Sequence, residues 1–431
     1  MSNSIAETLP GLNGYIESLQ QLESQLIGQC DAIEAWFKSQ WLESPAPFYG
    51  SVDLRNAGYK LAPVDMNLFP AGFNNLNPDF LSVAAEAASA AMKSAHPKAK
   101  SILLIPENHT RNLYYWASIH TLCQILETAG FTVQIGSLLP DDSRPQRVTL
   151  LGGVELPLLP LKRVGGSLQA GDVVSDVIVL NNDLSEGIPE ILQNLSQPVL
   201  PPPELGWSHR LKSGHFQYYA DVSAEFAELT GIDPWLIAPF FRHCGEVDFM
   251  HQEGIDCLVR NAHALFAAIR QEFTTRRIES DPFVVMKADA GTYGMGVMTL
   301  RNVDELQSLN RKERTRMAKT KSGQPVHQVI LQEGVYTFET VGPEDAVAEP
   351  VVYLMGERVI GGFYRVHKGR GTDENLNTPG MEFEPLPFIE PCHLKRSPGE
   401  SGPCGNRFYL YGLVARLSML AAARELREQQ K

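Results

Sequence analysis

The residues best suited to chemistry in this chain are a lysine and the glycines that follow it. Lys287 ends a short apolar run that is typical of a buried strand, and Gly291, Gly294 and Gly296 precede a second β-rich run that ends at Leu300. Glycines lack a Cβ, so their backbone N–H groups can wrap phosphate oxygens, and the lysine can reach the same phosphates. The pattern predicts a glycine-rich hairpin that binds phosphate, with an ordinary hairpin as the alternative. No helix follows the glycines, which excludes the Walker A and dinucleotide-binding motifs.

A second run supplies oxygen ligands. Asp373, Glu374, Asn375 and Asn377 fall within five residues. Carboxylate and amide oxygens are the ligands that Mg²⁺ prefers, and Mn²⁺ accepts the same set. The run therefore predicts a divalent cation beside the phosphates.

The six cysteines have no paired short spacings and are expected to be buried thiols in a reducing compartment. A zinc site built from His243, Cys244, Cys392 and His393 is the alternative, but no C-x-x-C element supports it.

A polar stretch over 51–77 is dense in Asp, Asn, Arg, Gly and Pro and has little periodicity. It is expected to be a loop, and polar loops on a scaffold commonly hold ligands. Turn formation by Asn and Asp explains each residue about as well. The residues suited to holding an α-amino or carboxylate group are Asp53, Arg55, Asp65, Asn67, Asn74 and Asn75.

The elements that would position these residues begin with an amphipathic helix over 15–37, which is expected to cover a core or a partner subunit. A βαβ unit follows, with strands over 101–105 and 131–135 around a helix over 113–126, and another strand is expected over 173–180. This alternation predicts an α/β fold with a parallel sheet in the first half of the chain.

The second half is expected to begin after the stiff connection Pro201–Pro203. A helix over 255–273 leads into the glycine hairpin, and a basic segment over 301–321 follows. A strand is expected over 329–335 and a hairpin over 350–365, with Gly356 at its turn. The predicted divisions are an N-terminal helical segment (1–45), an amino-acid-binding α/β domain (46–200) and a catalytic domain (201–431).

Composition limits the classes of function. The 431 residues carry a formal net charge of −13, which argues against general binding to nucleic acid or anionic membranes because both require basic surface. The first residues lack the basic and apolar regions of a secretory signal, and no apolar run reaches membrane-spanning length. A cytoplasmic protein with small-molecule partners is expected.

The order of these parts resembles an ATP-grasp ligase domain. Four separated phrases are more specific: they resemble the proteobacterial glutamate–cysteine ligase family, the type related to glutathione synthetase. The resemblance covers most of residues 45–425. The phrases are VDMNLFPAGFNNL, KADAGTYGMGV, GGFYRV and ENLNTPG, at 64–76, 287–297, 361–366 and 374–380.

The resemblance implies a Rossmann-like N-terminal domain followed by a glutathione-synthetase-like ATP-grasp domain. It implies ATP-dependent joining of glutamate to cysteine through an acyl phosphate, as the first step of glutathione biosynthesis, in a protein that could form homo-oligomers. Lys287 and Arg365 would be catalytic. The residues implied to bind ATP are Lys287, Gly291, Thr292, Gly294, Gly296, Gln332, Glu333 and Val335, and those nearest Mg²⁺ or Mn²⁺ are Glu374, Asn375 and Asn377.

One departure from the ATP-grasp pattern concerns an earlier nucleotide-binding lysine. No lysine lies between Lys212 and Lys287, so either Lys212 or an arginine such as Arg276 would take that role. Two alternatives to the ligase remain at this point: another carboxylate–amine ligase of the same fold, and a nucleotide-binding protein without turnover.

Overall fold

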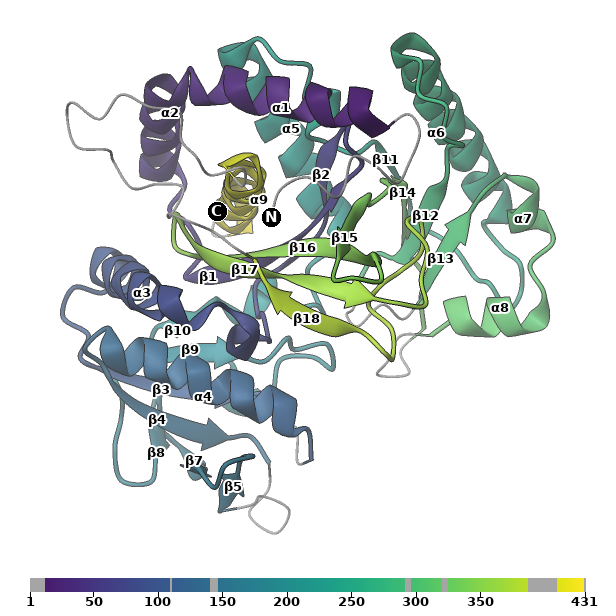
Figure 1. Cartoon of the computed structure of the whole chain (residues 1–431). Coiled ribbons are helices and arrows are strands. Elements are labelled where there is room, and N and C mark those ends of the chain that lie inside the picture. Colours follow the sequence, from purple (N-terminus) through teal and green to yellow (C-terminus); the bar gives the residue numbers. More distant parts are fainter. Residues whose placement is uncertain are drawn as a thin grey trace.

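The computed structural model describes residues 12–108, 111–139, 146–290, 296–319, 325–386 and 409–429. Within these ranges the chain forms a mixed α/β fold built on three principal sheets (Figure 1). One sheet is antiparallel and lies between two helical layers, and the other two lie beside it.

The antiparallel sheet has the strand order β18-β17-β16-β1-β2, with β15 paired to β16. It joins segments about 300 residues apart in the chain, since β1 pairs directly with β16. The strands are β1 (Tyr49–Asn56), β2 (Leu61–Asn67), β15 (Glu339–Val341), β16 (Ala346–Met355), β17 (Arg358–His367) and β18 (Glu382–Pro385). The sheet therefore takes strands from both sides of the Pro201–Pro203 connection.

The expectation of a loop over 51–77 is wrong for its first two thirds, which form β1 and β2. Side chains alternate across a strand, so Val52 and Leu54 enter the core while Asp53 and Arg55 face the other side. Alternating charges hid the strand pattern. The end of the stretch does hold turns, with 3-10 helices at Phe73–Asn75 and Pro78–Phe80.

The second sheet confirms the predicted βαβ unit. β3 (Ser101–Pro106) and β4 (Thr132–Ser137) are parallel and are joined by α4 (Leu113–Thr128). β9 (Val177–Asn181), β10 (Val199–Leu200) and β7 (Leu159–Val164) extend it in parallel, and β8 (Ser167–Ala170) is antiparallel to β7. The strand expected from residue 173 starts only at Val177. The residue before it, Asp176, accepts hydrogen bonds through its carboxylate from the N–H groups of Lys100 and Ser101.

α3 (Leu81–Ala95) and α4 cover this parallel sheet, and α3 also contacts β16 and β17 (Figure 1). A small hairpin of β5 (Arg147–Thr149) and β6 (Glu155–Pro157) lies beyond it. The parallel sheet is thus attached to one face of the antiparallel sheet through an apolar cluster that includes Met92, Ile119 and Tyr353.

The third sheet, in the order β11-β14-β12-β13, contains the predicted glycine hairpin. β12 (Val284–Ala288) and β13 (Val297–Leu300) are the two antiparallel strands of the hairpin. β12 also pairs with β14 (Val329–Glu333), which in turn pairs with β11 (Phe241–Cys244). α6 (Ile255–Arg276) packs on this sheet, and the short α7 (Asp304–Gln307) and α8 (Arg311–Met317) follow β13.

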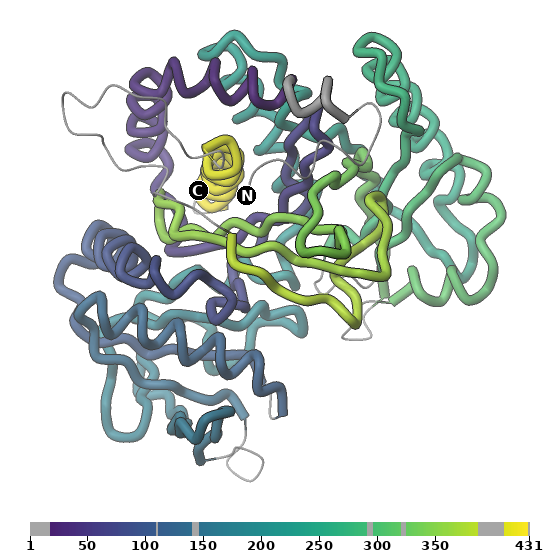
Figure 2. Tube along the Cα trace, in the orientation of Figure 1, coloured from purple at the N-terminus to yellow at the C-terminus, as the bar shows by residue number. Residues whose placement is uncertain are grey.

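The other face of the antiparallel sheet is covered by α1 (Leu12–Ile27), α2 (Cys30–Glu43), α5 (Lys212–Thr230) and α9 (Tyr409–Gln429). Figure 2 shows α9 enclosed by the N-terminal helices and the sheet. The single helix expected over 15–37 is two helices separated at Gly28 and Gln29. Within the described ranges, none of the helices combines the length and apolar character needed to cross a membrane.

A buried ion pair fastens α9 to the segment before α5. Arg210 is 1% exposed, and its Nε donates to both carboxylate oxygens of Glu425 at 3.0 Å. The same guanidinium donates to the Met66 carbonyl and to His215 Nδ1. Burial alone would raise the pKa of Glu425, but Arg210 and His215 lower it to about 2.

Glu425→Gln is expected to destabilise the protein by roughly 3–5 kcal/mol, because it leaves the Arg210 charge buried without a carboxylate. Since folding lowers the pKa of Glu425 from 4.5 to about 2, the contribution is present above pH 4.5 and disappears as the pH falls toward 2. Denaturant unfolding at several pH values measures both effects. Glu228→Gln, on the exposed side of α5, is the matched control; an equal loss in the two variants would contradict the assignment.

Candidate active site

A pocket of about 880 Å³, counting its open mouth, lies where the antiparallel sheet meets the sheet of the glycine hairpin. It brings together side chains that lie more than 300 residues apart in the chain. The predicted residues that line it are Asp53, Arg55, Asp65, Lys287, Gln332, Glu333, Val335, Arg365, Glu374, Asn375 and Asn377.

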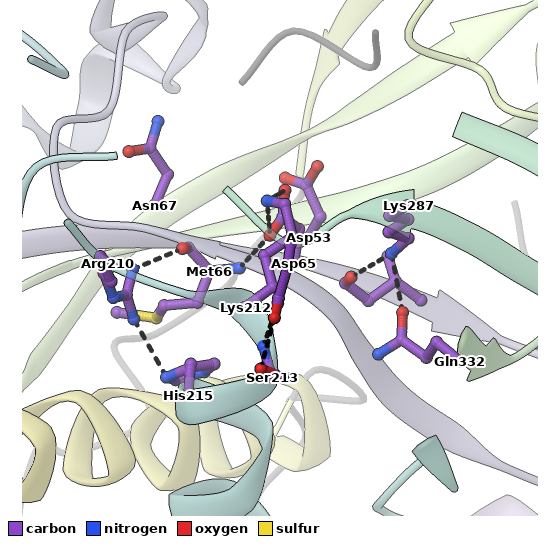
Figure 3. A network of polar contacts seen from close by, with 12 residues as sticks. Asp53, Asp65, Met66, Asn67, Arg210, Lys212, Ser213, His215, Lys287 and Gln332 are labelled. Atoms are coloured by element: carbon purple, nitrogen blue, oxygen red, sulfur yellow. Dashed lines mark hydrogen bonds and ion pairs between the residues drawn. The ribbon is translucent and has the colours of Figure 1, made fainter. Parts of the chain in front are cut away.

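Lys287 lies on β12, with its side chain on the pocket side. Its Nζ donates to the Val64 carbonyl at 2.6 Å and to Gln332 Oε1 at 2.7 Å (Figure 3). Burial lowers the pKa of Lys287 to about 8, although Asp65 partly opposes this. The two oxygens that hold the Lys287 ammonium group are both neutral, so its positive charge remains available to a ligand in the pocket.

Lys212, the first residue of α5, is the second lysine of the pocket. Its Nζ donates to both oxygens of Asp65 at 2.8 and 2.9 Å and lies 4.0 Å from the ring centre of Trp207. Desolvation alone would raise the pKa of Asp65, but Lys212 and Lys287 lower it to about 2. Arg276, the other candidate for this role, pairs with Asp233 and Glu272 and is not among the residues that line the pocket.

Arg365, on β17, forms the opposite wall with two carboxylates. Its Nη1 donates to Asp53 Oδ2 at 3.1 Å and to Glu349 Oε1. Glu349 also accepts a hydrogen bond from Arg55 Nε at 3.1 Å. Sequence reasoning missed Glu349, although a signal existed: it is the one charged residue of β16, and it is 3% exposed.

Arg55 ties this wall to two neighbouring segments. Beyond Glu349, it donates to the Val335 carbonyl at 3.2 Å and to the Glu374 carbonyl. Three of its N–H groups are therefore used within the protein, and the segments on either side of the pocket are joined through one guanidinium.

The oxygen-rich run lies at the mouth of the pocket. The Glu374 carboxylate accepts hydrogen bonds from Gly371 N at 2.7 Å and Arg370 Nη1 at 3.2 Å, and Asp373 pairs with Arg301. The Gly371 N–H is the main cause of a lowered pKa for Glu374. Within the described part of the chain, no group of three or more His, Cys, Asp or Glu residues is arranged to hold a metal. A cation here would need oxygens from a bound ligand.

Gln332 and Glu333 are adjacent on β14 and point in opposite directions. Glu333 faces away from Lys287 and accepts from Lys60 Nζ at 2.8 Å, Trp235 Nε1 at 3.1 Å and Phe240 N at 2.8 Å. Gln332 bonds Lys287 through Oε1, and its Nε2 is buried with no partner among the described residues, as is Nε of Arg365. Two unsatisfied donors on opposite walls of the pocket suit a ligand rich in acceptors.

Three predicted substrate residues do not line this pocket. Asn67 closes a turn by accepting from Phe69 N at 2.9 Å, and Figure 3 shows it apart from the Lys287–Gln332 pair. Asn74 donates to Asn75 at 3.2 Å on the exposed 3-10 turn. The turn chemistry named above as the alternative accounts for Asn67, and Asn74 and Asn75 lie in a 3-10 turn.

The glycine loop is described only at its base. Gly291, Thr292 and Gly294 lie outside the described residues, whereas Gly296 accepts a hydrogen bond from Ala288 N at 3.0 Å and has a positive φ of 68°. Its left-handed conformation explains why glycine stands where the loop rejoins β13. Of the residues proposed for zinc, Cys392 and His393 are also outside the described ranges. The Sγ atom of Cys244 lies 3.5 Å from the Sγ atom of Cys257.

Comparison with known proteins gives the family. The crystal structure of a protein from Methylobacillus flagellatus KT, described provisionally as a gamma-glutamylcysteine synthetase, is 51% identical and has a TM-score of 0.87, with 97% of this chain and 98% of that chain covered. A glutathione synthetase-like effector from Globodera pallida covers 87% and 82% of the two chains, but with 11% identity and a TM-score of 0.38 it supports no structural argument.

Among curated proteins, none matches the chain. The family model described as glutamate-cysteine ligase matches residues 23–426, which is nearly the whole chain. The chain therefore belongs to the glutamate–cysteine ligase family.

Proposed function

We propose that this protein joins the side-chain carboxylate of L-glutamate to the amine of L-cysteine at the expense of ATP, giving γ-glutamylcysteine for glutathione biosynthesis. The observation that carries the proposal is the convergence of Lys212, Lys287 and Arg365 on one pocket in a chain of this family. Three cations with interleaved carboxylates suit a polyphosphate next to a carboxylate substrate.

The same proposal extends to the fold and its partners. Residues 201–431 would form an ATP-grasp catalytic domain of the glutathione-synthetase type, and the parallel sheet within 46–200 a Rossmann-like domain that supports the amino-acid site. Glutamate, cysteine and ATP would be the partners, in the cytoplasm. The net charge of −13 supports small-molecule partners over nucleic acid or membrane surfaces. A homo-oligomer remains a prediction.

ATP, when bound, supplies the phosphoryl group that activates the glutamate carboxylate. The residues present fit it, because the pocket offers two lysines, two arginines and two buried donors that lack partners among the described residues. Lys287 and Lys212 would neutralise phosphate charge. Arg365 would bind oxygens where the transferred phosphoryl group meets the glutamate carboxylate. Gln332 and the backbone from Glu333 to Val335 would line the adenine side, since the Glu333 side chain is already occupied by Lys60.

A divalent cation also fits the donor set. Glu374, Asn375 and Asn377 line the pocket mouth and supply oxygen atoms only. These are hard ligands suited to Mg²⁺ or Mn²⁺, and bound phosphates would complete the set. These residues would hold the cation against the phosphates, where its positive charge would add to that of the two lysines.

The direct test of the activity measures phosphate release from ATP with glutamate, cysteine and other amino acids, singly and in pairs. Phosphate release coupled to amide formation is expected with glutamate and cysteine together. Faster release with another carboxylate–amine pair would assign a different ligase of the same fold. Nucleotide binding without turnover under all pairs would exclude a ligase.

Lys287→Ala is expected to lower ATP affinity and turnover by roughly tenfold or more each, because a charge-assisted contact to phosphate is lost. In the unsubstituted protein, ATP affinity should also fall as the pH rises above about 8, where Lys287 loses its proton. Binding calorimetry between neutral and alkaline pH measures the ATP affinity of the variant and of the unsubstituted protein. Circular dichroism checks that the variant is folded, and ligation at the original rate would reject the assignment.

Activity is expected to require Mg²⁺ or Mn²⁺ and to be unaffected by zinc removal, because the pocket offers oxygen ligands. Ligation is measured after exhaustive treatment with a general chelator and again with each metal restored. A zinc-selective chelator at saturating Mg²⁺ serves as the control treatment. Inhibition by that chelator would count against the oxygen-ligand site.

Arg55→Lys is expected to raise the KM for glutamate roughly tenfold, with the Kd for ATP changed much less, because the pocket wall around Glu349 loosens when the planar guanidinium is lost. Asn67→Ala, two residues beyond Asp65 on β2 but outside the pocket lining, is the matched control. Steady-state kinetics with each substrate varied separates the effects. Equal KM values for glutamate in both variants would remove Arg55 from the substrate site.

A further inference from the structure

The pocket contains several carboxylates, and their hydrogen-bond partners differ sharply. Both oxygens of Asp65 are held by Lys212, and both oxygens of Glu349 are held by arginines. Glu333 accepts three donors on the far side of its strand. Each of these carboxylates is committed to holding the pocket together.

Asp53 is the exception among the pocket carboxylates of β1, β2, β14 and β16. Its Oδ2 accepts from Arg365 Nη1 at 3.1 Å, and within the described residues Oδ1 accepts no hydrogen bond. The side chain is 24% exposed, against 4% for the Glu349 side chain, so Oδ1 remains accessible from the pocket. Asp53 therefore combines a fixed position with a free acceptor atom.

We infer that Asp53 is the general base that removes a proton from the ammonium group of the acceptor amino acid. The inference rests on the proposed function, because it places the acyl phosphate beside Arg365, the residue that holds Asp53. An amine attacks only through its lone pair, and the ammonium form has none. A carboxylate next to the acyl carbon removes this obstacle where the amine must react.

The proton balance of the step is complete without another reactant. The first ammonium proton moves to Asp53 Oδ1, and the freed lone pair forms the C–N bond at the acyl carbon. The C–O bond to phosphate then breaks, and phosphate leaves with its electron pair. The second nitrogen proton goes to the departing phosphate, so HPO₄²⁻ and the amide are the products, and Asp53 returns its proton to water.

The electrostatic surroundings agree with this role. Burial raises the pKa of Asp53; Arg365 opposes the rise, while Glu349 and Asp65 add to it. Asp65 and Glu374 have pKa values shifted the other way, which makes them weaker bases. The charged or titratable groups that face Asp53 are Arg365 on β17, Glu349 and Tyr353 on β16, Asp65 on β2 and Lys287 on β12.

Asp53→Asn, which removes the base but keeps the shape, separates the two halves of the reaction. Phosphoryl transfer to glutamate is followed without cysteine, by scrambling of heavy oxygen from the β,γ bridge of ATP. This exchange is expected at close to the original rate. Amide formation with cysteine is expected to fall by roughly a hundredfold to ten-thousandfold in kcat, with little change in the KM for cysteine.

Hydroxylamine distinguishes a base from a binding residue, because it is largely neutral at neutral pH and needs no proton removed before attack. Asp53→Asn should therefore form the hydroxamate from glutamate at a rate near that of the original protein. In the original protein, kcat/KM for cysteine should decline as the pH falls through a value above the usual aspartate range, and the variant should lack this decline.

Three results would overturn the inference: cysteine ligation that survives in Asp53→Asn, a hydroxylamine rate lost as completely as the cysteine rate, or loss of the isotope exchange. Asp53→Ser replaces the variant if the amide form does not fold, and Asp53→Glu should restore part of the cysteine rate. Asp79→Asn, an exposed carboxylate outside the pocket lining, is the control. Absence of isotope exchange in the original protein would instead reject the proposed function itself.

Discussion

Burial of charge is the constraint on which this structure depends. Lys212, Arg55 and Arg365 each meet a carboxylate in a pocket wall, because an ion removed from water without a partner costs several kcal/mol. The partners come from β1, β2 and β16, and the cations from α5, β1 and β17. The pairing of distant segments and the assembly of the site are therefore one event.

The antiparallel sheet makes that event possible by using its two faces differently. One face is largely apolar and packs against α9, with Val52, Leu54 and Val352 in its core. The other is apolar at one end, where Tyr353 and Phe363 pack against α3, and charged at the other, where Asp53, Glu349 and Arg365 meet. A single sheet thus anchors the parallel-sheet region and forms the wall of the pocket.

The sequence predicts local structure here better than it predicts assembly. The glycine hairpin and the βαβ unit each have their signal within one segment, and both are confirmed. β1 and β2 were hidden because their charged residues face a pocket made by strands near the other end of the chain. Asn67, Asn74 and Asn75 lie in the same polar stretch as Asp53 and Asp65. Only tertiary contacts show which of these residues line the pocket and which lie in turns. Glu349 stands out as the one charged residue of β16, but its partners Arg55 and Arg365 come from β1 and β17, so only the structure assigns its role.

The placement of α9 has a consequence for synthesis of the protein. This helix, over Tyr409–Gln429, fills the core between α1, α5 and the antiparallel sheet. The ribosome produces β1 about 300 residues before its partner β16, and the helix that covers both comes later still. Until β16 and α9 are synthesised, β1 and β2 therefore have exposed edges and an uncovered apolar face, a state that folds slowly and is prone to aggregation. The nascent chain is a natural client for chaperones until nearly all of it has emerged.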